Sequence, residues 1–532
     1  CEWDGDKLTV WASTQGVHAV REGLAKGLDV PQANIRVITD YMGGGFGSKL
    51  GIDRADTTCA RLAKTAGRPV KLMLDRKEEH LATGNRPSAY ARVRAGVGAD
   101  GKLTAFDAET WGTGGAGAGA GFPLPYNVYQ FPNRRRRHTD VYINAGPQRA
   151  MRAPGHPQGC FITEVVMDEL ADRLRMDPLE LRLRNLPPEA PDAMWGKYYK
   201  MGAERIGWSK RHPTGDATPG PVKRGLGCAA NRWAGAGSRQ TRAQCEIFPD
   251  GGVVMRIGTQ DIGTGTRTIV EIVTAETFGL TLDQVVAEIG DTRFPFAPGS
   301  GGSVTIGSVS PTARVTAEKA LAALAEKVAP ALGVAATDIV AAKGRLHAKG
   351  DPSKGMIWKE ACKLLGTTSL VVDGQWEQGL SSVGTSGVQF ADVEVDIETG
   401  VTKIRKIVCV QDCGTIIDKL TAESQCYGGI TMGIGYAMFE HRILDRNTAL
   451  MVNPNMEFYR LPGPSDMPEI DVVLVDQPER GVVGLGEPPT ISTAAAVANA
   501  VSNATGARVR NLPITPETVL AAIEQEKARG TL

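Results

Sequence analysis

Met42-Gly43-Gly44-Gly45-Phe46-Gly47-Ser48-Lys49 follows a strand-like segment, Ile35 to Ile38, and precedes a helix-like segment, Ile52 to Ala66. Because glycine has no Cβ, the backbone N–H groups of such a loop are open to an anion, and the dipole of the following helix favours negative charge there. The same order of strand, glycine loop and helix recurs between Met255 and Phe278. The pattern predicts an α/β chain with mixed α+β character and with glycines at the junctions between elements.

Glycine is frequent, at 64 of 532 residues, and shows no collagen-like period. One glycine loop is weak evidence for a binding site, because most glycine turns are only turns. Several potential anion sites in one chain, however, imply a large polyanionic ligand. The candidate loops span residues 42–49, 152–155, 261–265, 299–305 and 484–489.

The first loop departs from two familiar nucleotide-binding motifs. A dinucleotide fingerprint needs a third glycine where Ser48 stands, and a Walker loop needs Ser or Thr after its lysine, where the chain has Leu50 after Lys49. A flavin- or nicotinamide-dependent dehydrogenase that binds pyrophosphate in these loops is therefore a weaker interpretation. A non-catalytic, glycine-rich scaffold is the other alternative, and analysis of bound metal and flavin separates the three.

Composition disfavours several classes of partner. With 60 Lys and Arg against 59 Asp and Glu the net charge is +1, so charge alone attracts neither nucleic acid nor an anionic membrane. The only basic run, Arg134 to Arg137, is interpreted as a solvated face. No apolar stretch approaches the roughly 20 residues that cross a bilayer, and we expect no membrane span.

The nine cysteines are odd in number and widely spaced, which favours reduced and mostly buried thiols. Cys409 and Cys413 fall on the same face of a strand-like segment. A metal site is disfavoured there because no second cysteine pair or histidine is nearby. The cysteine spacing also shows no iron–sulfur ligand run.

The chain is predicted to form two domains. A helix is expected from Cys160 to about Leu174 and a short one after Asp177, up to Leu186. The polar, proline-rich stretch from Pro187 to Pro221 is interpreted as a linker, with a boundary near residue 210, so the domains are residues 1–210 and 211–532. Further helices are predicted over residues 17–28 and 492–504 and from residue 516 onward.

Taken together and in this order, the five loops resemble the large subunit of the molybdenum hydroxylases, the family of xanthine dehydrogenase and aldehyde oxidase. The resemblance implies two elongated domains with the molybdenum cofactor at their interface. Gly486 to Pro489 is similar to the family's catalytic motif and puts Glu487 in the position of the catalytic base. Gln15 matches a glutamine that hydrogen-bonds the metal's oxo group, and it is the second residue to which a catalytic role is carried over.

The other matching segments are similar to those that hold the pterin cofactor. Phe46 stands where the family's phenylalanine backbone lies beside molybdenum, Arg152 matches an arginine of the second cofactor segment, and Gln425 matches a glutamine that contacts the pyranopterin. The stretches 261–266 and 302–305 resemble the loops around the phosphates and tail. The residues implied to bind the cofactor are Gly45, Phe46, Gly47, Arg152, Gly263, Thr264, Gly265, Gly302, Ser303, Thr305, Gln425 and Gly486.

The resemblance also implies the cofactor and the reaction. The cofactor is molybdopterin with molybdenum, with the cytosine dinucleotide form left open, and the metal is held by the pterin rather than by a protein ligand. The reaction inserts a water-derived oxygen into a C–H bond of an aldehyde or an N-heteroaromatic compound. Electrons then pass to separate [2Fe–2S] and FAD subunits in a heteromeric complex, with a haem-bearing chain as the alternative acceptor.

Two departures from the family pattern narrow the substrate. Purine-oxidising relatives carry a glutamate where this chain has Leu50, and the segment 148–156 lacks the cysteine of the carbon-monoxide branch. Aldehydes are therefore favoured slightly over N-heteroaromatic compounds.

The chain opens directly on a hairpin-like segment, Glu2 to Trp11. Because the relatives have an α/β domain ahead of this point, we expect another chain or fragment to supply it. The expected location is the cytoplasm, with the periplasm as the alternative.

Overall fold

The computed structural model describes residues 1–187 and 194–530. The predicted opening hairpin is confirmed, and β3 joins β2 in parallel after α1 crosses between them. Val17, Val20 and Leu24 are buried on one side of α1, as their helical spacing predicted. The N-terminal unit consists of β1 (Glu2–Asp4), β2 (Lys7–Trp11), α1 (Val17–Leu28), β3 (Ile35–Ile38) and α2 (Arg54–Ala66).

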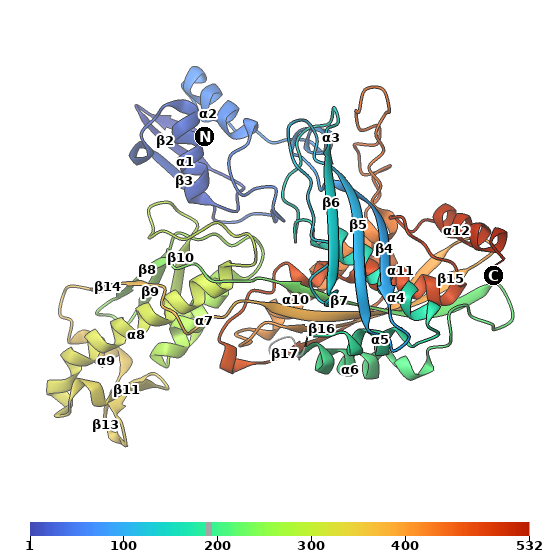
Figure 1. The fold of residues 1–532 in the computed structure, drawn as a ribbon. Helices are drawn as coiled ribbons and strands as arrows, with labels where there is room; N and C mark the ends of the chain where they lie inside the picture. The colour runs from blue at the N-terminus through green and yellow to red at the C-terminus, as the bar shows by residue number, and fades with distance from the viewer. Residues whose placement is uncertain (188–193, 531–532) are drawn as a thin grey trace.

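A second unit also contains two strands that pair in parallel and are connected in the chain by a helix. Its sheet has the order β10-β9-β8-β14, and α7 and the long α8 cover the apolar side of the sheet. A bridge between Ile38 and Asp291 joins this unit to the N-terminal unit, which is drawn in blue in Figure 1. The elements are β8 (Arg242–Ile247), β9 (Val253–Ile257), α7 (Thr266–Phe278), β10 (Val285–Ile289), α8 (Thr305–Leu332), β11 (Ile339–Ala342), β12 (Arg345–Ala348), β13 (Asp351–Ile357), α9 (Trp358–Lys363) and β14 (Leu370–Gln375).

The largest body is built on two further sheets of long strands (Figure 1). One has the order β4-β5-β6, and its edge strand β6 exposes Arg134 to Arg137, which confirms the solvated basic face. The strands are β4 (Ser88–Val97), β5 (Leu103–Thr113) and β6 (Asn133–Val141) in the first sheet, and β17 (Glu469–Val475), β16 (Thr402–Asp412), β15 (Thr385–Asp396) and β7 (Val222–Trp233) in the second. The remaining helices of this body are α3 (Arg76–Ala82), α4 (His156–Arg173), α5 (Pro178–Arg184), α6 (Met194–Ile206), α10 (Lys419–Ile434), α11 (Thr493–Thr505) and α12 (Pro516–Ala528).

Two helices enclose the second sheet from opposite faces. Successive residues of a strand point to opposite faces; in β15, Gln389 accepts a hydrogen bond from Thr493 of α11, whereas Phe390 packs against Tyr199 of α6. The alanine-rich α11 lies very close to β7, because a Cβ on Gly227 would lie 2.3 Å from the carbonyl oxygen of Ala496. The predicted helices over 492–504 and from 516 onward are confirmed as α11 and α12.

The prediction of a linker over 187–221 is wrong for most of the described part of that stretch. Residues 194–206 form α6, whose Trp195, Tyr198 and Tyr199 are fully buried, while residues 188–193 lie outside the described residues. The prolines and polar residues on either side obscured the helical spacing of these aromatic side chains. The core around α6 combines residues from both sides of position 210, and the domain boundary proposed there stays a prediction.

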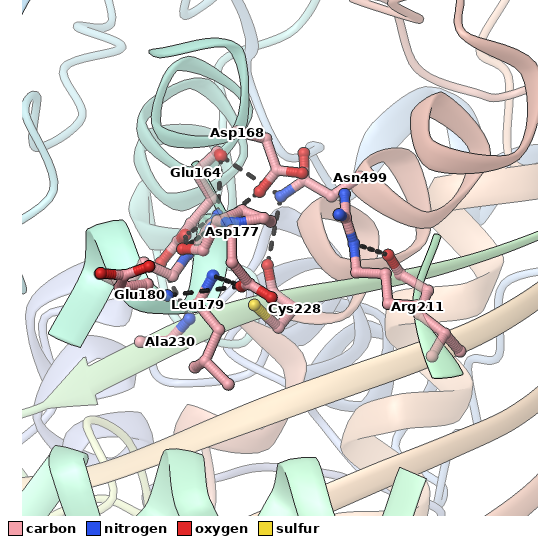
Figure 2. Close-up of polar contacts among 12 residues, drawn as sticks. Glu164, Asp168, Asp177, Leu179, Glu180, Arg211, Cys228, Ala230 and Asn499 are labelled. Carbon is pink, nitrogen blue, oxygen red and sulfur yellow. Dashed lines mark hydrogen bonds and ion pairs between the residues drawn. The ribbon is translucent and has the colours of Figure 1, made fainter. Parts of the chain in front are cut away.

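A fully buried charge cluster joins helices α4 and α5 to β7 and α11 (Figure 2). Arg182 of α5 bonds to Glu164 at 2.7 Å and to Asp168 at 2.7 Å, and none of the three side chains is more than 2% exposed. Glu164 also accepts a hydrogen bond from the backbone N–H of Ala230 in β7, and Asn499 of α11 donates to its carbonyl oxygen. The cluster therefore fixes α4 and α5 against elements from the second half of the chain.

Within residues 1–187 and 194–530, no helix combines the length and the apolar character needed to cross a membrane. All nine cysteines are free and eight of them are buried, which confirms the expected buried thiols.

Candidate active site

The glycine loops that the sequence singled out meet at one cavity of about 660 Å³. Its wall is made by the N-terminal unit, the α7–α8 unit and the largest body, so residues far apart in the chain face one another there. Gly265 lies in the wall of an adjoining cavity of about 460 Å³. The other predicted site residues that line the main cavity are Gln15, Gly45, Phe46, Gly47, Arg152, Gly263, Thr264, Gly302, Ser303, Thr305, Gln425, Gly486 and Glu487.

Glu487 presents a carboxylate to this cavity. Its Oε1 accepts a hydrogen bond from the backbone N–H of Ala153 at 3.0 Å, and its Oε2 accepts one from the hydroxyl of Ser303 at 3.1 Å. Its own backbone N–H donates to the same hydroxyl oxygen at 2.9 Å. Burial raises the pKa of Glu487 above its usual 4.5, and these two donors and nearby positive charge oppose the rise.

Three non-glycine residues around the cavity have left-handed backbone conformations. Phe46 has φ 51°, Ala153 has φ 60° and Ser303 has φ 59°. This region is strained for residues with a Cβ and persists where surrounding contacts require it. Two of the three supply the hydrogen bonds to Glu487, so the strain is located at the group that holds the carboxylate.

Gln15 is held rigidly in the wall. Its Oε1 accepts hydrogen bonds from the backbone N–H groups of Gly47 at 2.8 Å and Lys49 at 3.1 Å, and its Nε2 donates to the carbonyl oxygen of Ser300 at 2.6 Å. A Cβ on Gly45 would lie 2.5 Å from Cγ and Oε1 of Gln15. The glycine at 45 is therefore needed for this loop to pack on Gln15, which fixes its amide against the cavity.

Arg152 ties together segments that are hundreds of residues apart. Its Nε donates to the carbonyl oxygen of Gly486, its Nη2 donates to that of Gln425 at 2.9 Å, and its backbone N–H donates to that of Phe46 at 2.6 Å. Burial lowers the pKa of Arg152 to about 10, so the side chain is still charged at neutral pH. One buried cation thus joins the loop of Glu487 to two other loops of the cavity.

The wall is suited to a large anionic group. Helix α8 places Thr305 of its first turn in it, and helix N-termini favour negative charge. A Cβ added to Gly43 or Gly263 would meet no atom within 4 Å, so glycine leaves these parts of the wall open. These features fit a cofactor that carries phosphate.

Comparison with known proteins agrees with this geometry. Residues 1–186 and 201–468 match two family models, each described as a molybdopterin cofactor-binding domain. The aldehyde oxidoreductase molybdenum-binding subunit PaoC of Escherichia coli (strain K12) is 34% identical over 97% of this chain and 72% of the relative. The chain belongs to the molybdopterin-binding large subunits of the xanthine oxidase family.

Two further relatives show the same relationship. The putative xanthine dehydrogenase molybdenum-binding subunit XdhA of Escherichia coli (strain K12) is 31% identical over 97% of this chain and 73% of the relative. The crystal structure of quinoline 2-oxidoreductase from Pseudomonas putida 86 superposes with a TM-score of 0.87 over 98% of this chain and 73% of the other, at 24% identity. The fold expected of a molybdenum hydroxylase large subunit is thus confirmed.

The loop at 261–265 corrects one expectation for this molybdenum hydroxylase subunit. The carboxylate of Asp261 accepts hydrogen bonds from the backbone N–H groups of Gly263, Thr264 and Gly265, at 2.9, 3.0 and 3.2 Å, and from that of Arg267 at 3.1 Å. The predicted anion cradle of this loop is therefore filled by its own aspartate. A contact of Gly263, Thr264 or Gly265 with the cofactor stays a prediction.

Some residues that shape the site carry no motif in the sequence. Trp233, at the end of β7, lines the cavity, donates from Nε1 to the carbonyl oxygen of Gly302 at 2.9 Å and packs on His156 with ring centroids 4.4 Å apart. Ala153 holds Glu487 only through its backbone, and its position next to Arg152 was the one available signal. Strand ends and backbone donors are decided by the fold, so residue type alone did not reveal them.

Proposed function

We propose that this large subunit catalyses the molybdenum-dependent hydroxylation of aldehydes, with Glu487 as the base. The observation that carries the proposal is the carboxylate of Glu487. It faces the cofactor cavity and is held by the N–H of Ala153 and the hydroxyl of Ser303. Among the described residues, no ion pair within 4.0 Å neutralises it, so it is available to accept a proton.

The residues around the cavity divide into those that hold the cofactor and one that moves a proton. The molybdenum cofactor, when bound, supplies the centre that takes two electrons from the substrate carbon. Arg152, Gln15 and Gln425 would hold it through the wall described above. Glu487 accepts the proton of the water-derived oxygen that attacks the carbon. Burial raises its pKa, which makes it a stronger proton acceptor than an exposed glutamate.

The walls of the cavity favour an uncharged substrate. Leu50 lines it where purine-oxidising relatives carry a glutamate, and the only Lys, Arg, Asp or Glu residues in its described wall are Arg152, Asp418 and Glu487. The similarity to an aldehyde oxidoreductase subunit puts aldehydes first. N-heteroaromatic compounds are the second candidate, because the indole of Trp233 offers a flat apolar face.

Oxidation of an aldehyde and water to a carboxylic acid releases two electrons and two protons. We infer that the electrons pass to separate [2Fe–2S] and FAD subunits, in keeping with relatives that are subunits of larger enzymes. The adjoining cavity of about 460 Å³ offers room for a nucleotide tail, which supports the cytosine dinucleotide form of the cofactor. A cytoplasmic location stays a prediction.

A substrate screen on the purified holoenzyme complex tests this function. The screen compares aliphatic and aromatic aldehydes, N-heteroaromatic compounds and purines as substrates, with an artificial dye as the electron acceptor. Glu487→Gln with the same molybdenum content is the control. Aldehydes are expected to give the highest kcat/KM, and the variant is expected to turn them over slower by orders of magnitude. Turnover of heteroaromatic compounds alone would replace aldehydes by the second candidate, and near-normal turnover in the variant would remove Glu487 as the base.

A further inference from the structure

Arg86 lies in the loop between α3 and β4. It contacts Arg152 and Ala153, in the loop whose backbone donates a hydrogen bond to Glu487. Its Nη2 donates to the carbonyl oxygen of Arg152 at 2.7 Å, and its Nη1 lies 3.5 Å from that of Ala153. The carbonyl of Arg152 and the N–H of Ala153 belong to one peptide group. Arg86 therefore binds one end of this peptide group, and Glu487 accepts a hydrogen bond from the other end at 3.0 Å.

This arrangement gives the peptide group a defined direction. Ala153 has φ 60°, a conformation that costs free energy for a residue with a Cβ and needs support from its neighbours. A rotated peptide would turn its carbonyl oxygen toward the carboxylate of Glu487, where the two oxygens repel. A charged donor on the carbonyl also polarises the peptide and strengthens the N–H as a donor, because hydrogen bonds in series are cooperative.

The positive charge of Arg86 also favours the ionised form of Glu487. Arg86 and Arg152 are the two cations that stabilise the ionised form of Glu487, and neither forms an ion pair with it. The hydroxyl of Tyr459 donates to Glu440 at 2.7 Å, so part of the charge of Glu440 is taken up locally. The titratable groups that face Arg86 are Tyr436, Glu440, Tyr459, His156 and Glu487.

We propose that Arg86 is a positioning residue for the reaction: it fixes the peptide group between Arg152 and Ala153 so that the N–H of Ala153 orients the carboxylate of Glu487. The proposal rests on the proposed function of Glu487 as the base. It adds a residue that does not line the cofactor cavity, and whose effect reaches Glu487 through one peptide group.

The first test measures kcat/KM against pH for the holoenzyme complex with Arg86→Gln and Arg86→Lys. Arg86→Gln removes the charge, so the pKa of Glu487 rises and the acidic limb moves to higher pH by about half a unit, while kcat falls about tenfold from lost orientation. Arg86→Lys keeps the charge and is expected to restore the position of the limb. Arg211→Gln is the matched control, because Arg211 (labelled in Figure 2) also donates to backbone carbonyls, those of Leu226 and His212, and none of these residues lines the cavity.

The second test does not depend on turnover. Infrared difference spectra between the cofactor-free full chain and its Glu487→Gln variant follow the carbonyl stretch of protonated Glu487 as pH changes. Arg86→Gln is expected to move this titration upward, and Arg211→Gln to leave it unchanged. An unmoved titration in Arg86→Gln, or an equal shift in Arg211→Gln, would overturn the role of Arg86. If instead Glu487→Gln retained turnover, the base assignment would fail, while the infrared titration would still decide whether Arg86 controls Glu487.

Discussion

Glu164 and Glu487 are both glutamates whose pKa is raised by burial, but the structure surrounds them differently. Glu164 has Arg182 as a direct ion-pair partner and accepts further hydrogen bonds from the hydroxyl of Tyr129 and the N–H of Ala230. Every side of that carboxylate contacts protein. Glu487 has two donors, no direct cation, and an open face toward the cavity.

The difference separates a structural carboxylate from a chemical one. A buried ion whose hydrogen-bonding capacity is filled loses stability when either partner is removed, because the remaining charge is left without compensation. A carboxylate that is oriented but incompletely paired keeps capacity for a proton. Substitutions at the two positions are therefore expected to affect different measurements.

The largest effect is expected from Glu487→Gln. The amide keeps the size of the side chain but cannot accept a proton, so kcat should fall by about 10²–10⁴-fold. Molybdenum content and the unfolding midpoint should match those of the wild type, because no ion pair is broken. Kinetics on the holoenzyme with metal analysis check this, and a loss of stability as large as that in Glu164→Gln would break the comparison.

Glu164→Gln should have the opposite profile. It leaves Arg182 with Asp168 alone and points an amide N–H₂ at existing donors, so the free energy of unfolding should fall by about 3–5 kcal/mol. The protein that remains folded should show the wild-type pH profile. Denaturant unfolding and kcat/KM against pH measure the two quantities, and an altered profile would show that Glu164 is coupled to the reaction.

Wild-type activity should follow the ionisation of Glu487. The base works only when deprotonated, so kcat/KM should rise with pH through its pKa, and burial places that acidic limb above 4.5, the usual value for glutamate. A limb below 4.5 in the pH profile of the holoenzyme would contradict this environment.

Ser303→Ala should move that limb further. It removes the hydroxyl that donates to Oε2 of Glu487, so the ionised form loses stabilisation and the limb should shift upward by about one pH unit. Ser310→Ala is a suitable control, since the hydroxyl of Ser310 bonds within α8. A shift in the control as large as in Ser303→Ala would point to α8 as a whole rather than to the contact.

The smallest effect is expected from Tyr129→Phe. This change removes the hydroxyl that donates to Oε1 of Glu164 at 2.8 Å, as the hydroxyl of Ser303 donates to Glu487. It should lower the free energy of unfolding by about 1 kcal/mol. The pH profile should stay that of the wild type. Together with Ser303→Ala it compares the same chemical change at the two carboxylates, and matching pH shifts in both variants would remove the distinction between them.

Much of the local structure could be predicted from the sequence. The opening hairpin, α1, α2, α7 and α11 follow from apolar spacing and from glycine or proline at their ends, which act between near neighbours in the chain. The resemblance of five loops to one family also indicated which side chains to expect around a cofactor. The helix at Met194–Ile206 was missed because its buried aromatic residues lie within a polar, proline-rich stretch.

The sequence by itself determined the chemical identity of the site: a glutamate before two prolines, an arginine, two glutamines and loops of glycine in a fixed order. Only the tertiary structure decided how they act together. Gln15 bonds to Ser300, and Arg152 to Gly486, across hundreds of residues. It also decided that Asp261 fills its own loop and that one peptide group links Arg86 to Glu487. Such contacts depend on backbone groups that every residue carries, so their direction is set by the folded chain and not by residue type.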